Sequence, residues 1–257
     1  MLNIPTFPDL AGKTALVTGG SGGIGAETAR WLASNGVRVA VAGRDQERLD
    51  NVLASLEAIS LGHVAVRADC SRVEDLEQIR TDLNGHFGKL DILAAFAGGG
   101  TSRPAALEDV TEEDWRSSLD NNLTATFLTL KAFVPSLKEG RGGAVITMAS
   151  TAGRAPSQAP LGYGVSKAGV ILLTQQTAYD LGPSQVRVNC ISPSAVMTSR
   201  TAQIIPPAVQ QQIVLAHPIR RLGLPSDVAA ATLFLASESS SWLTGATLDI
   251  AGGRLMH

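Results

Sequence analysis

The chain has 257 residues, of which 44% are apolar, so it can bury a large core. Its net charge of −2 does not indicate a nucleic-acid partner, and no apolar run approaches the length of a membrane span. The N-terminus lacks the basic and apolar regions of a secretory signal, and the two cysteines, Cys70 and Cys190, have no metal-ligand spacing. We therefore expect a cytoplasmic protein that binds no metal, no nucleic acid and no membrane.

Short apolar runs alternate with helical patterns along the chain. The predicted strands span residues 14–18, 37–42, 63–68, 91–96, 143–148, 186–191 and 246–250. The predicted helices span residues 23–35, 45–60, 72–88, 111–138, 161–182 and 225–237. This alternation predicts an α/β fold with a doubly wound, seven-stranded parallel sheet and helices on both faces. Because no proline- or serine-rich linker divides the chain, we expect a single domain over residues 1–257.

The first predicted strand runs into a glycine-rich turn, KTALVTGGSGGIG, over residues 13–25. The turn satisfies G-x-G-x-x-G with Gly20, Gly22 and Gly25, and T-G-x-x-x-G-x-G with Thr18, Gly19, Gly23 and Gly25. A strand, a glycine turn and a helix together present free backbone N–H groups to a phosphate. Glycine also lets a pyrophosphate approach the backbone closely. A plain tight turn is the alternative, but the flanking elements favour a Rossmann-type nucleotide site.

The residues after the second predicted strand bear on the choice of cofactor. A carboxylate at this place binds the ribose hydroxyls of NAD, but Gly43 has no side chain. Arg44 follows, and its planar, permanently charged fork suits the 2′-phosphate of NADP. Arg44 as a merely solvated residue is one alternative. Asp45 as the ribose carboxylate is another, although its place before residues 46–49 fits a helix N-cap better.

Two further loops follow predicted strands at the same edge of the sheet. Asp69 follows the third strand and can accept a hydrogen bond from an adenine amino group; a helix cap for Ser71 onward is nearly as good an explanation. Gly98 opens a run of three glycines after the fourth strand. This run leaves room for a cofactor beside the backbone, or it is only a flexible loop.

A tyrosine and a lysine four residues apart suggest acid–base chemistry. Tyr163 and Lys167 share one face of a predicted helix, YGVSKAGVILL. The unperturbed tyrosine pKa of about 10 is too high for efficient catalysis at neutral pH, and a nearby ammonium lowers it. A tyrosine and a lysine at this spacing are usually exposed side chains with no catalytic role. Ser150 strengthens the catalytic interpretation, because it ends the fifth predicted strand at the edge where catalytic groups collect.

These residues together resemble the short-chain dehydrogenase/reductase family, of the single-domain classical type, over nearly the whole chain. Ser150, Tyr163 and Lys167 match its Ser and Tyr-x-x-x-Lys pattern, and Asn122, rather than Asn121, matches the asparagine that holds a water in a proton relay. The resemblance implies that Lys167 also binds the nicotinamide ribose. The cofactor contacts that it implies are Thr18, Gly19, Ser21, Gly22, Gly23, Ile24, Gly25, Arg44, Asp69, Cys70, Ala97, Gly98, Tyr163, Lys167, Pro193 and Thr198.

The chain departs from the family pattern at two places near this site. The family has Asn-Asn-Ala-Gly after the fourth strand, where this chain has Ala95-Phe96-Ala97-Gly98. We therefore expect apolar packing in place of the hydrogen bonds of the asparagines. The family also has Pro-Gly where this chain has Pro193-Ser194, so we expect a change in the loop that meets the nicotinamide amide. Thr198 remains available for that amide.

The resemblance implies hydride transfer between a nicotinamide cofactor and a carbonyl or alcohol. We expect NADP(H), with NAD(H) as the alternative, and a ketoreductase resembling 3-oxoacyl-ACP reductases that acts on a largely apolar ketone. An NAD-linked alcohol or sugar dehydrogenase is one alternative function. A non-catalytic NADP-binding sensor is another, which the intact set of catalytic residues disfavours.

Two expectations concern larger surfaces. Residues 194–218 are rich in apolar side chains and indicate a lid over the substrate; a helix packed permanently on the core is the alternative. Helices 111–138 and 161–182 carry more apolar residues than one buried stripe requires. We expect them to pack against their copies in a homodimer, within a homotetramer. The alternative is that a single subunit buries both helices.

Overall fold

The computed structural model describes residues 4–100, 103–140 and 142–256, apart from the side chain of Ile204. Within them a parallel sheet has the strand order β3-β2-β1-β4-β5-β6-β7. Its strands are β1 (Thr14–Thr18), β2 (Arg38–Gly43), β3 (Val64–Arg67), β4 (Ile92–Ala95), β5 (Gly143–Met148), β6 (Val186–Pro193) and β7 (Thr247–Ile250). This is the doubly wound Rossmann order, extended by a seventh strand, so the predicted fold is confirmed.

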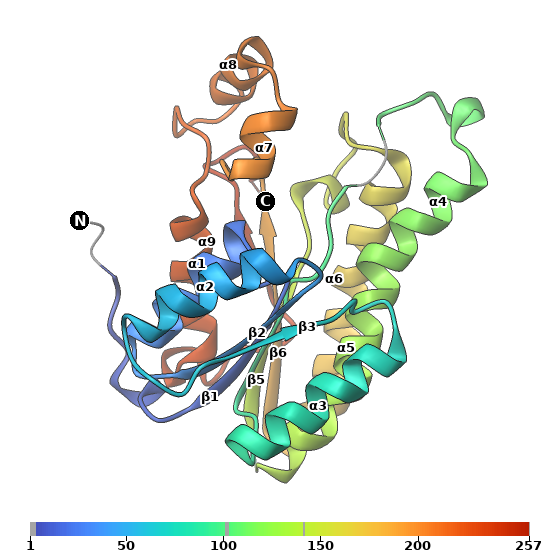
Figure 1. Ribbon diagram of the computed structural model, residues 1–257. Coiled ribbons are helices and arrows are strands. Elements are labelled where there is room, and N and C mark those ends of the chain that lie inside the picture. Colours follow the sequence, from blue (N-terminus) through green and yellow to red (C-terminus); the bar gives the residue numbers. More distant parts are fainter. Residues whose placement is uncertain (1–3, 101–102, 141, 257) are drawn as a thin grey trace.

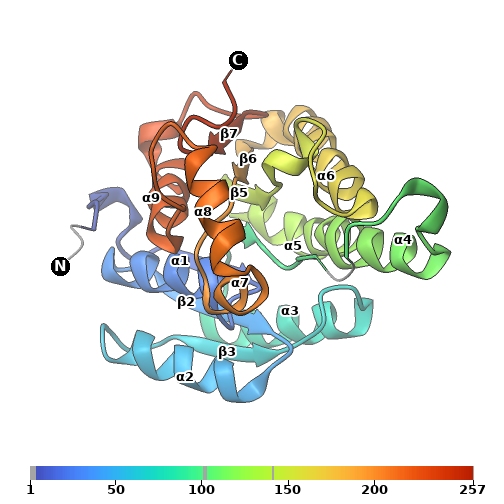
Figure 2. The same ribbon diagram turned by 90° about the horizontal axis from the view of Figure 1, so that it is seen from above.

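Helices cover both faces of the sheet (Figures 1 and 2). Helices α1, α2 and α9 lie on one face, and α3, α5 and α6 lie on the other. The helices are α1 (Gly23–Ser34), α2 (Gln46–Glu57), α3 (Val73–Phe87), α4 (Glu112–Leu119), α5 (Ala125–Glu139), α6 (Leu161–Leu181), α7 (Ser199–Ile204), α8 (Pro207–Leu215) and α9 (Pro225–Ala236). The short helices α7 and α8 project beyond the carboxyl ends of the strands (Figure 1).

Alternate residues of the central strands supply the two cores. Ala15 and Val17 face the core under α1 and α9, whereas Leu16 faces the core under α3 and α5. All three are fully buried. A strand buried on both faces must be apolar throughout, which is why β1 is a continuous apolar run in the sequence.

Two predicted elements differ from the observed ones. The predicted helix over 111–138 is divided into α4 and α5 by a π-helical turn, Asp120–Thr124, although the chain continues along the same course. Strand β6 runs to Pro193 instead of residue 191, because β7 pairs with its second half, from Cys190 to Pro193. Neither π turns nor strand extension by a distant partner can be recognised from local periodicity.

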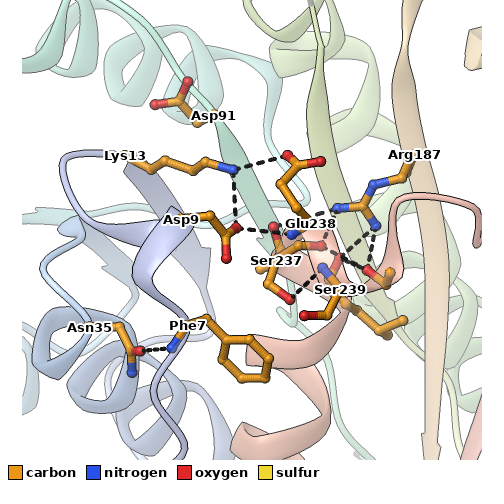
Figure 3. A network of polar contacts seen from close by, with 12 residues as sticks. Phe7, Asp9, Lys13, Asn35, Asp91, Arg187, Ser237, Glu238 and Ser239 are labelled. Carbon is orange, nitrogen blue, oxygen red and sulfur yellow. Dashed lines mark hydrogen bonds and ion pairs between the residues drawn. The ribbon is translucent and has the colours of Figure 1, made fainter.

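A polar network fastens the end of α9 to the edge of the sheet opposite the strand carboxyl ends (Figure 3). The Arg187 guanidinium of β6 donates to the carbonyl of Leu235 at 2.8 Å and to the Ser240 hydroxyl at 2.7 Å. The Asp9 carboxylate accepts the backbone N–H of Glu238 at 2.9 Å. Cations and donors at a helix C-terminus satisfy carbonyls that have no partner within the helix. Arg187 therefore has a structural role.

Candidate active site

The glycine turn between β1 and α1 forms a cradle whose glycines bring the backbone close to its neighbours. Gly19 has φ +67°, and a Cβ there would lie 2.8 Å from the Phe96 carbonyl oxygen. A Cβ on Gly25 would collide with the backbone of Gly19. Gly22, by contrast, is exposed and has open space above it. A side chain is therefore excluded beneath the turn, while its outer surface is open to a ligand.

The amino end of α1 fits the phosphates of a dinucleotide. No side chain caps this helix, and Ala26 donates the first backbone hydrogen bond of the helix, to the carbonyl of Gly22 at 3.2 Å. The N–H groups of the preceding residues, Gly23, Ile24 and Gly25, have no acceptor four residues back in the helix. Uncapped N–H groups and the positive end of the helix dipole attract an anion. These residues stand where the sequence predicts a pyrophosphate site.

Thr18 joins the end of β1 to the loop after β4. Its Oγ1 accepts the backbone N–H groups of Phe96 at 3.0 Å and Ala97 at 3.1 Å. Ala95 and Phe96 are buried, and Phe96 belongs to the core under α1. The expected apolar packing at these positions is therefore confirmed. Thr18 also supplies a polar link between strands at this edge.

The end of β2 brings Arg44 and Ser21 to one place. A Cβ on Gly43 would lie 2.9 Å from both Cβ and Oγ of Ser21, so a carboxylate side chain does not fit there without movement of Ser21. Asp45 accepts the backbone N–H of Arg48 at 3.1 Å and caps α2, which confirms the N-cap interpretation of Asp45. Arg44 is exposed, and its Nη1 lies 3.9 Å from Oδ2 of Asp69.

Asp69 fills the second of its two predicted roles, that of a cap, and its adenine contact stays a prediction. Its Oδ1 accepts the N–H of Ser71 at 3.0 Å and the Ser71 hydroxyl at 2.7 Å, as a turn cap does. Its Oδ2 faces Arg44. Partial burial raises the pKa of Asp69, but the Ser71 hydrogen bonds and the charges of Arg44 and Arg72 outweigh burial and lower this pKa. Neighbouring Cys70 is buried, and burial raises its pKa to about 12, so the thiol stays protonated at neutral pH.

Ser150, Tyr163 and Lys167 come together at the end of β5. Ser150 lies two residues beyond this strand, and Tyr163 and Lys167 lie in the first two turns of α6. The Ser150 side chain lies beside the Tyr163 hydroxyl and lowers its pKa by hydrogen bonding. The Lys167 ammonium is buried, donates to the Met148 carbonyl at 2.8 Å and lies 5.7 Å from the centre of the tyrosine ring. The structure thus assembles the three residues that the sequence singles out.

The expected effect of Lys167 on Tyr163 is wrong for this structure. Burial raises the pKa of Tyr163, and the Ser150 hydrogen bond and the charge of Arg200 only partly offset burial. Burial also lowers the pKa of Lys167, to about 8. The ammonium is directed to the Met148 carbonyl, 5.7 Å from the ring centre, so it is not among the groups that set the tyrosine pKa here.

Asn122 lies in the π turn between α4 and α5 and faces the same place. Its Oδ1 accepts the N–H of Gly99 at 2.9 Å, and its Nδ2 donates to the carbonyl of Ser118 at 2.9 Å. A Cβ on Gly98 would lie 2.7 Å from Oδ1 of Asn122 and 3.4 Å from Nζ of Lys167. Glycine at position 98 therefore lets the loop backbone pass close to both the Asn122 amide and the Lys167 ammonium. The amide of Asn121 donates instead to the carbonyl of Ser117.

The segment after β6 begins beside the glycine turn. Pro193 is buried at the end of β6, and the Ser194 hydroxyl is hydrogen-bonded to Nε2 of buried His217 at 2.9 Å. Ser194 does not have positive φ, so the glycine of the family pattern is not required there. Thr198 caps α7, and its Cγ2 would lie 3.1 Å from a Cβ on Gly23. Thr198 therefore stands over the cradle, as expected of a cofactor contact.

Sequence reasoning missed Arg200, the second residue of α7. Its Nη2 donates to the carbonyl of Gly100 at 2.5 Å, and its Nη1 lies 2.9 Å from the position of a Cβ on Gly99. Its charge opposes the rise in the Tyr163 pKa. The one feature of the sequence that could have indicated Arg200 is its positive charge two residues after Thr198, near the start of the predicted lid. No spacing connects that cation with the tyrosine.

Over residues 4–100, 103–140 and 142–256, no helix is long and apolar enough to cross a membrane. In the same ranges, no group of three or more His, Cys, Asp or Glu side chains is arranged to hold a metal ion.

The glycine cradle and the Ser-Tyr-Lys set define a class of dinucleotide-dependent oxidoreductase, and comparison with known proteins agrees. A family model described as enoyl-(acyl carrier protein) reductase matches residues 19–254. Dehydrogenase/reductase SDR family member 4 of Oryctolagus cuniculus is 38% identical over 248 residues, covering 95% of this chain and 94% of that protein. The 7alpha-hydroxysteroid dehydrogenase of Escherichia coli K12 is 33% identical over 244 residues, covering 95% and 94%.

Solved structures are similar over almost the whole chain. A short-chain type dehydrogenase/reductase from Mycobacterium marinum superposes with a TM-score of 0.91 at 32% identity, covering 98% of both chains. A 7 alpha-hydroxysteroid dehydrogenase complexed with NADH and 7-oxo glycochenodeoxycholic acid gives the same TM-score, identity and coverage. The chain belongs to the short-chain dehydrogenase/reductase family, which uses a nicotinamide cofactor, and it is an oxidoreductase.

Proposed function

We propose that this protein is an NADP(H)-dependent ketoreductase that converts a largely apolar ketone to a secondary alcohol. The observation that carries the proposal is the placement of Ser150 beside Tyr163, one helical turn from Lys167, which is buried and donates to the Met148 carbonyl. This group stands at the sheet edge that also holds the glycine cradle. An open α/β sheet binds its ligands at this edge.

Each residue of the site has its own role in the proposed reduction. The bound nicotinamide supplies the hydride that the carbonyl carbon takes up. Ser150 holds the carbonyl oxygen, and the Tyr163 hydroxyl donates the proton that this oxygen needs to become an alcohol. The Lys167 ammonium would bind the ribose hydroxyls, and hydrogen bonding from Ser150 favours the phenolate left on Tyr163. Asn122 holds the water through which Lys167 is linked to solvent, so the tyrosine regains its proton.

The end of β2 supports NADP(H) over NAD(H). Ser21 occupies the space that a carboxylate side chain at position 43 would need. Arg44 is the exposed cation next to it, and Asp45 is committed to capping α2. A 2′-phosphate placed between Ser21 and Arg44 would receive a charge-assisted hydrogen bond. NADH in the structure of the similar 7 alpha-hydroxysteroid dehydrogenase makes NAD(H) the alternative to test.

The segment 194–218 supports a bulky apolar substrate. No residue of α8 is buried, and Val209 and Leu215 are 41% and 68% exposed. Permanent packing of α8 on the core, the alternative explanation, does not fit these exposures. A lid that closes on a nonpolar ketone would bury such side chains. One similar protein is named for a hydroxysteroid and the matching family model for an enoyl-acyl group, and both names denote molecules with a large apolar part.

The first test is a panel of ketones and secondary alcohols with NADPH and NADH, followed by absorbance. We expect ketone reduction with a higher kcat/KM for NADPH. Oxidation of alcohols or sugars with NAD alone would replace the proposal with the NAD-linked dehydrogenase. Tight NADPH binding with no turnover on any member would favour the sensor.

Arg44→Ala tests the cofactor part of the proposal. Loss of a charge-assisted phosphate contact should lower kcat/KM with NADPH, by an amount that corresponds to about 1.5–3 kcal/mol of activation free energy. The value of kcat/KM with NADH should change little. The control is Arg48→Ala, an exposed arginine of α2 that pairs with Asp45. Equal efficiency of the unaltered enzyme with both cofactors would refute the NADP(H) assignment.

Assembly and location are also part of the proposal. We infer a homodimer or homotetramer built on α5 and α6, and a cytoplasmic location. Phe127 and Leu172 on these helices are 47% and 66% exposed, which supports the assembly.

A further inference from the structure

Arg200 is a cation near the candidate active site, and the reaction described above does not explain its role. It lies in α7, yet its guanidinium extends to the loop after β4, where it bonds the carbonyl of Gly100 at 2.5 Å. Gly99 has φ +142°, and a side chain on it would meet the guanidinium. The close approach therefore depends on glycine at position 99.

Asn122 holds the same loop from its other side. The amide of Asn122 bonds both the N–H of Gly99, at 2.9 Å, and its carbonyl, at 3.2 Å. The backbone of residues 98–100 thus runs between Asn122 and Lys167 below and Arg200 above. This loop therefore holds the guanidinium on the side opposite Asn122 and Lys167.

Arg200 has no opposite charge to neutralise it among residues 4–100, 103–140 and 142–256. It makes no ion pair with a carboxylate in these ranges, whereas Arg154 and Arg221 each pair with an aspartate. Its charge acts on Tyr163 instead, where it favours the phenolate. An exposed guanidinium with no carboxylate partner, close enough to act on the proposed proton donor, is suited to an anionic group on a bound substrate.

We propose that Arg200 binds a carboxylate carried by the ketone substrate, close to the carbonyl that is reduced. This inference rests on the proposed ketoreductase function and narrows its substrate to oxo acids with an apolar chain. The guanidinium fork matches a carboxylate bidentately.

Paired substrates separate this role from others. The probes are 2-oxooctanoate and 4-oxooctanoate, each with its methyl ester, which keeps the carbonyl and the chain but removes the charge. The variants are Arg200→Gln and Arg200→Lys. The control is Arg220→Gln. Arg220 is also exposed, lies just beyond the far end of the segment 194–218, and also donates to a backbone carbonyl, that of Leu215.

Arg200→Gln should lower kcat/KM roughly ten- to hundredfold for at least one of the two oxo acids and change it little for the ester. Arg200→Lys should recover part of the loss, since it restores charge without the fork. An equal loss for acid and ester would overturn the proposal and assign Arg200 to holding the lid. A matching loss in NADPH affinity, measured by fluorescence without substrate, would overturn it in favour of a cofactor contact.

A binding experiment keeps the proposal testable without turnover. Octanoate has the carboxylate and the chain but no ketone, so it reports the anion site alone. Calorimetry on the enzyme saturated with NADP⁺ should show octanoate binding that Arg200→Gln weakens at least about tenfold and Arg220→Gln leaves unchanged. If no ketone is reduced but octanoate binds this way, the proposed function fails and the anion site stands. If the esters are reduced but Arg200→Gln does not weaken octanoate binding, the anion site is refuted and the proposed ketoreductase function stands.

Discussion

Lys167 is the most constrained ionisable residue of the site. It is 3% exposed, and its ammonium makes one hydrogen bond, to the Met148 carbonyl. Burial disfavours the charged form, so its pKa falls from 10.5 to about 8. The protein therefore holds a charge at a cost in stability, which is typical of a functional residue rather than a packing residue.

Lys167→Met tests this cost through its pH dependence. Because the folded-state pKa lies below the unfolded one, the unfolded state binds more protons between pH 8 and 10.5, so stability rises with pH there. The methionine variant lacks this effect. The free energy of unfolding of the unaltered protein, minus that of the variant, should increase by roughly 3 kcal/mol across the window. Urea denaturation at several pH values measures it, and a constant difference would show that burial does not lower this pKa.

Prediction from sequence succeeded at the residue level where chemistry has a fixed spacing. Ser150, Tyr163 and Lys167 were found because a helical turn and a strand end determine their relative positions. Arg200 was not found, because its position depends on how the segment after β6 folds back over Gly99. The Tyr163 pKa was mispredicted for a similar reason: burial outweighs nearby charges, and burial is a property of the whole fold.

At the level of elements, Arg187 shows how one side chain ends a helix and anchors it. Its guanidinium bonds the carbonyls of Leu235 and Ser237, at 2.8 and 3.1 Å, and the hydroxyl of Ser240. The structure therefore explains this arginine by stability and not by catalysis. It lies at the sheet edge opposite the candidate site.

Arg187→Met should destabilise the protein by about 2–4 kcal/mol, because buried carbonyls lose their donors. Chemical denaturation measures the loss. Lys13→Met is the matched control, since Lys13 belongs to the same network but forms exposed ion pairs, which contribute about 1 kcal/mol or less. NADPH affinity of the folded Arg187 variant should be unchanged. A loss of affinity without a loss of stability would show that we have misjudged its role.

The predicted helix 111–138 shows the limit of periodicity. Its existence and extent were predicted, but the π turn at 120–124 was not. That turn includes Asn122, whose side chain reaches Gly99 and Ser118. An inserted residue in a helix redirects one side chain without changing the apolar pattern on either side. Local sequence therefore identified the residue but not the distortion associated with it.

At the scale of the whole molecule, the strand order could be predicted from the sequence, whereas the quaternary structure is a prediction that still has to be tested. The alternation of elements and the handedness of crossovers leave few topologies. Helices α5 and α6 bury residues such as Phe133 and Val170, yet expose Phe127, Leu172 and Tyr179. One subunit therefore does not bury both helices completely, and we expect a copy of the chain to cover the rest.

Light scattering at micromolar concentration tests the assembly. We expect a dimer or tetramer, and Phe127→Glu combined with Leu172→Glu should shift it toward monomer, because charge in an apolar interface is costly. Leu61→Glu is the control, because Leu61 is 81% exposed in the loop between α2 and β3. A monomeric unaltered protein would refute the proposed interface.

The central claim is that Tyr163 donates the proton in ketone reduction, and Tyr163→Phe tests it most directly. The variant keeps the ring but loses the hydroxyl that bonds Ser150. Tyr179→Phe is the control, because Tyr179 is the other of the two tyrosines and is 83% exposed on the same helix. We predict that Tyr163→Phe binds NADPH as the unaltered enzyme does, while kcat for the ketone falls by about 10²–10⁴-fold. Retention of most of the ketone reductase activity by this variant would contradict the proposed chemistry.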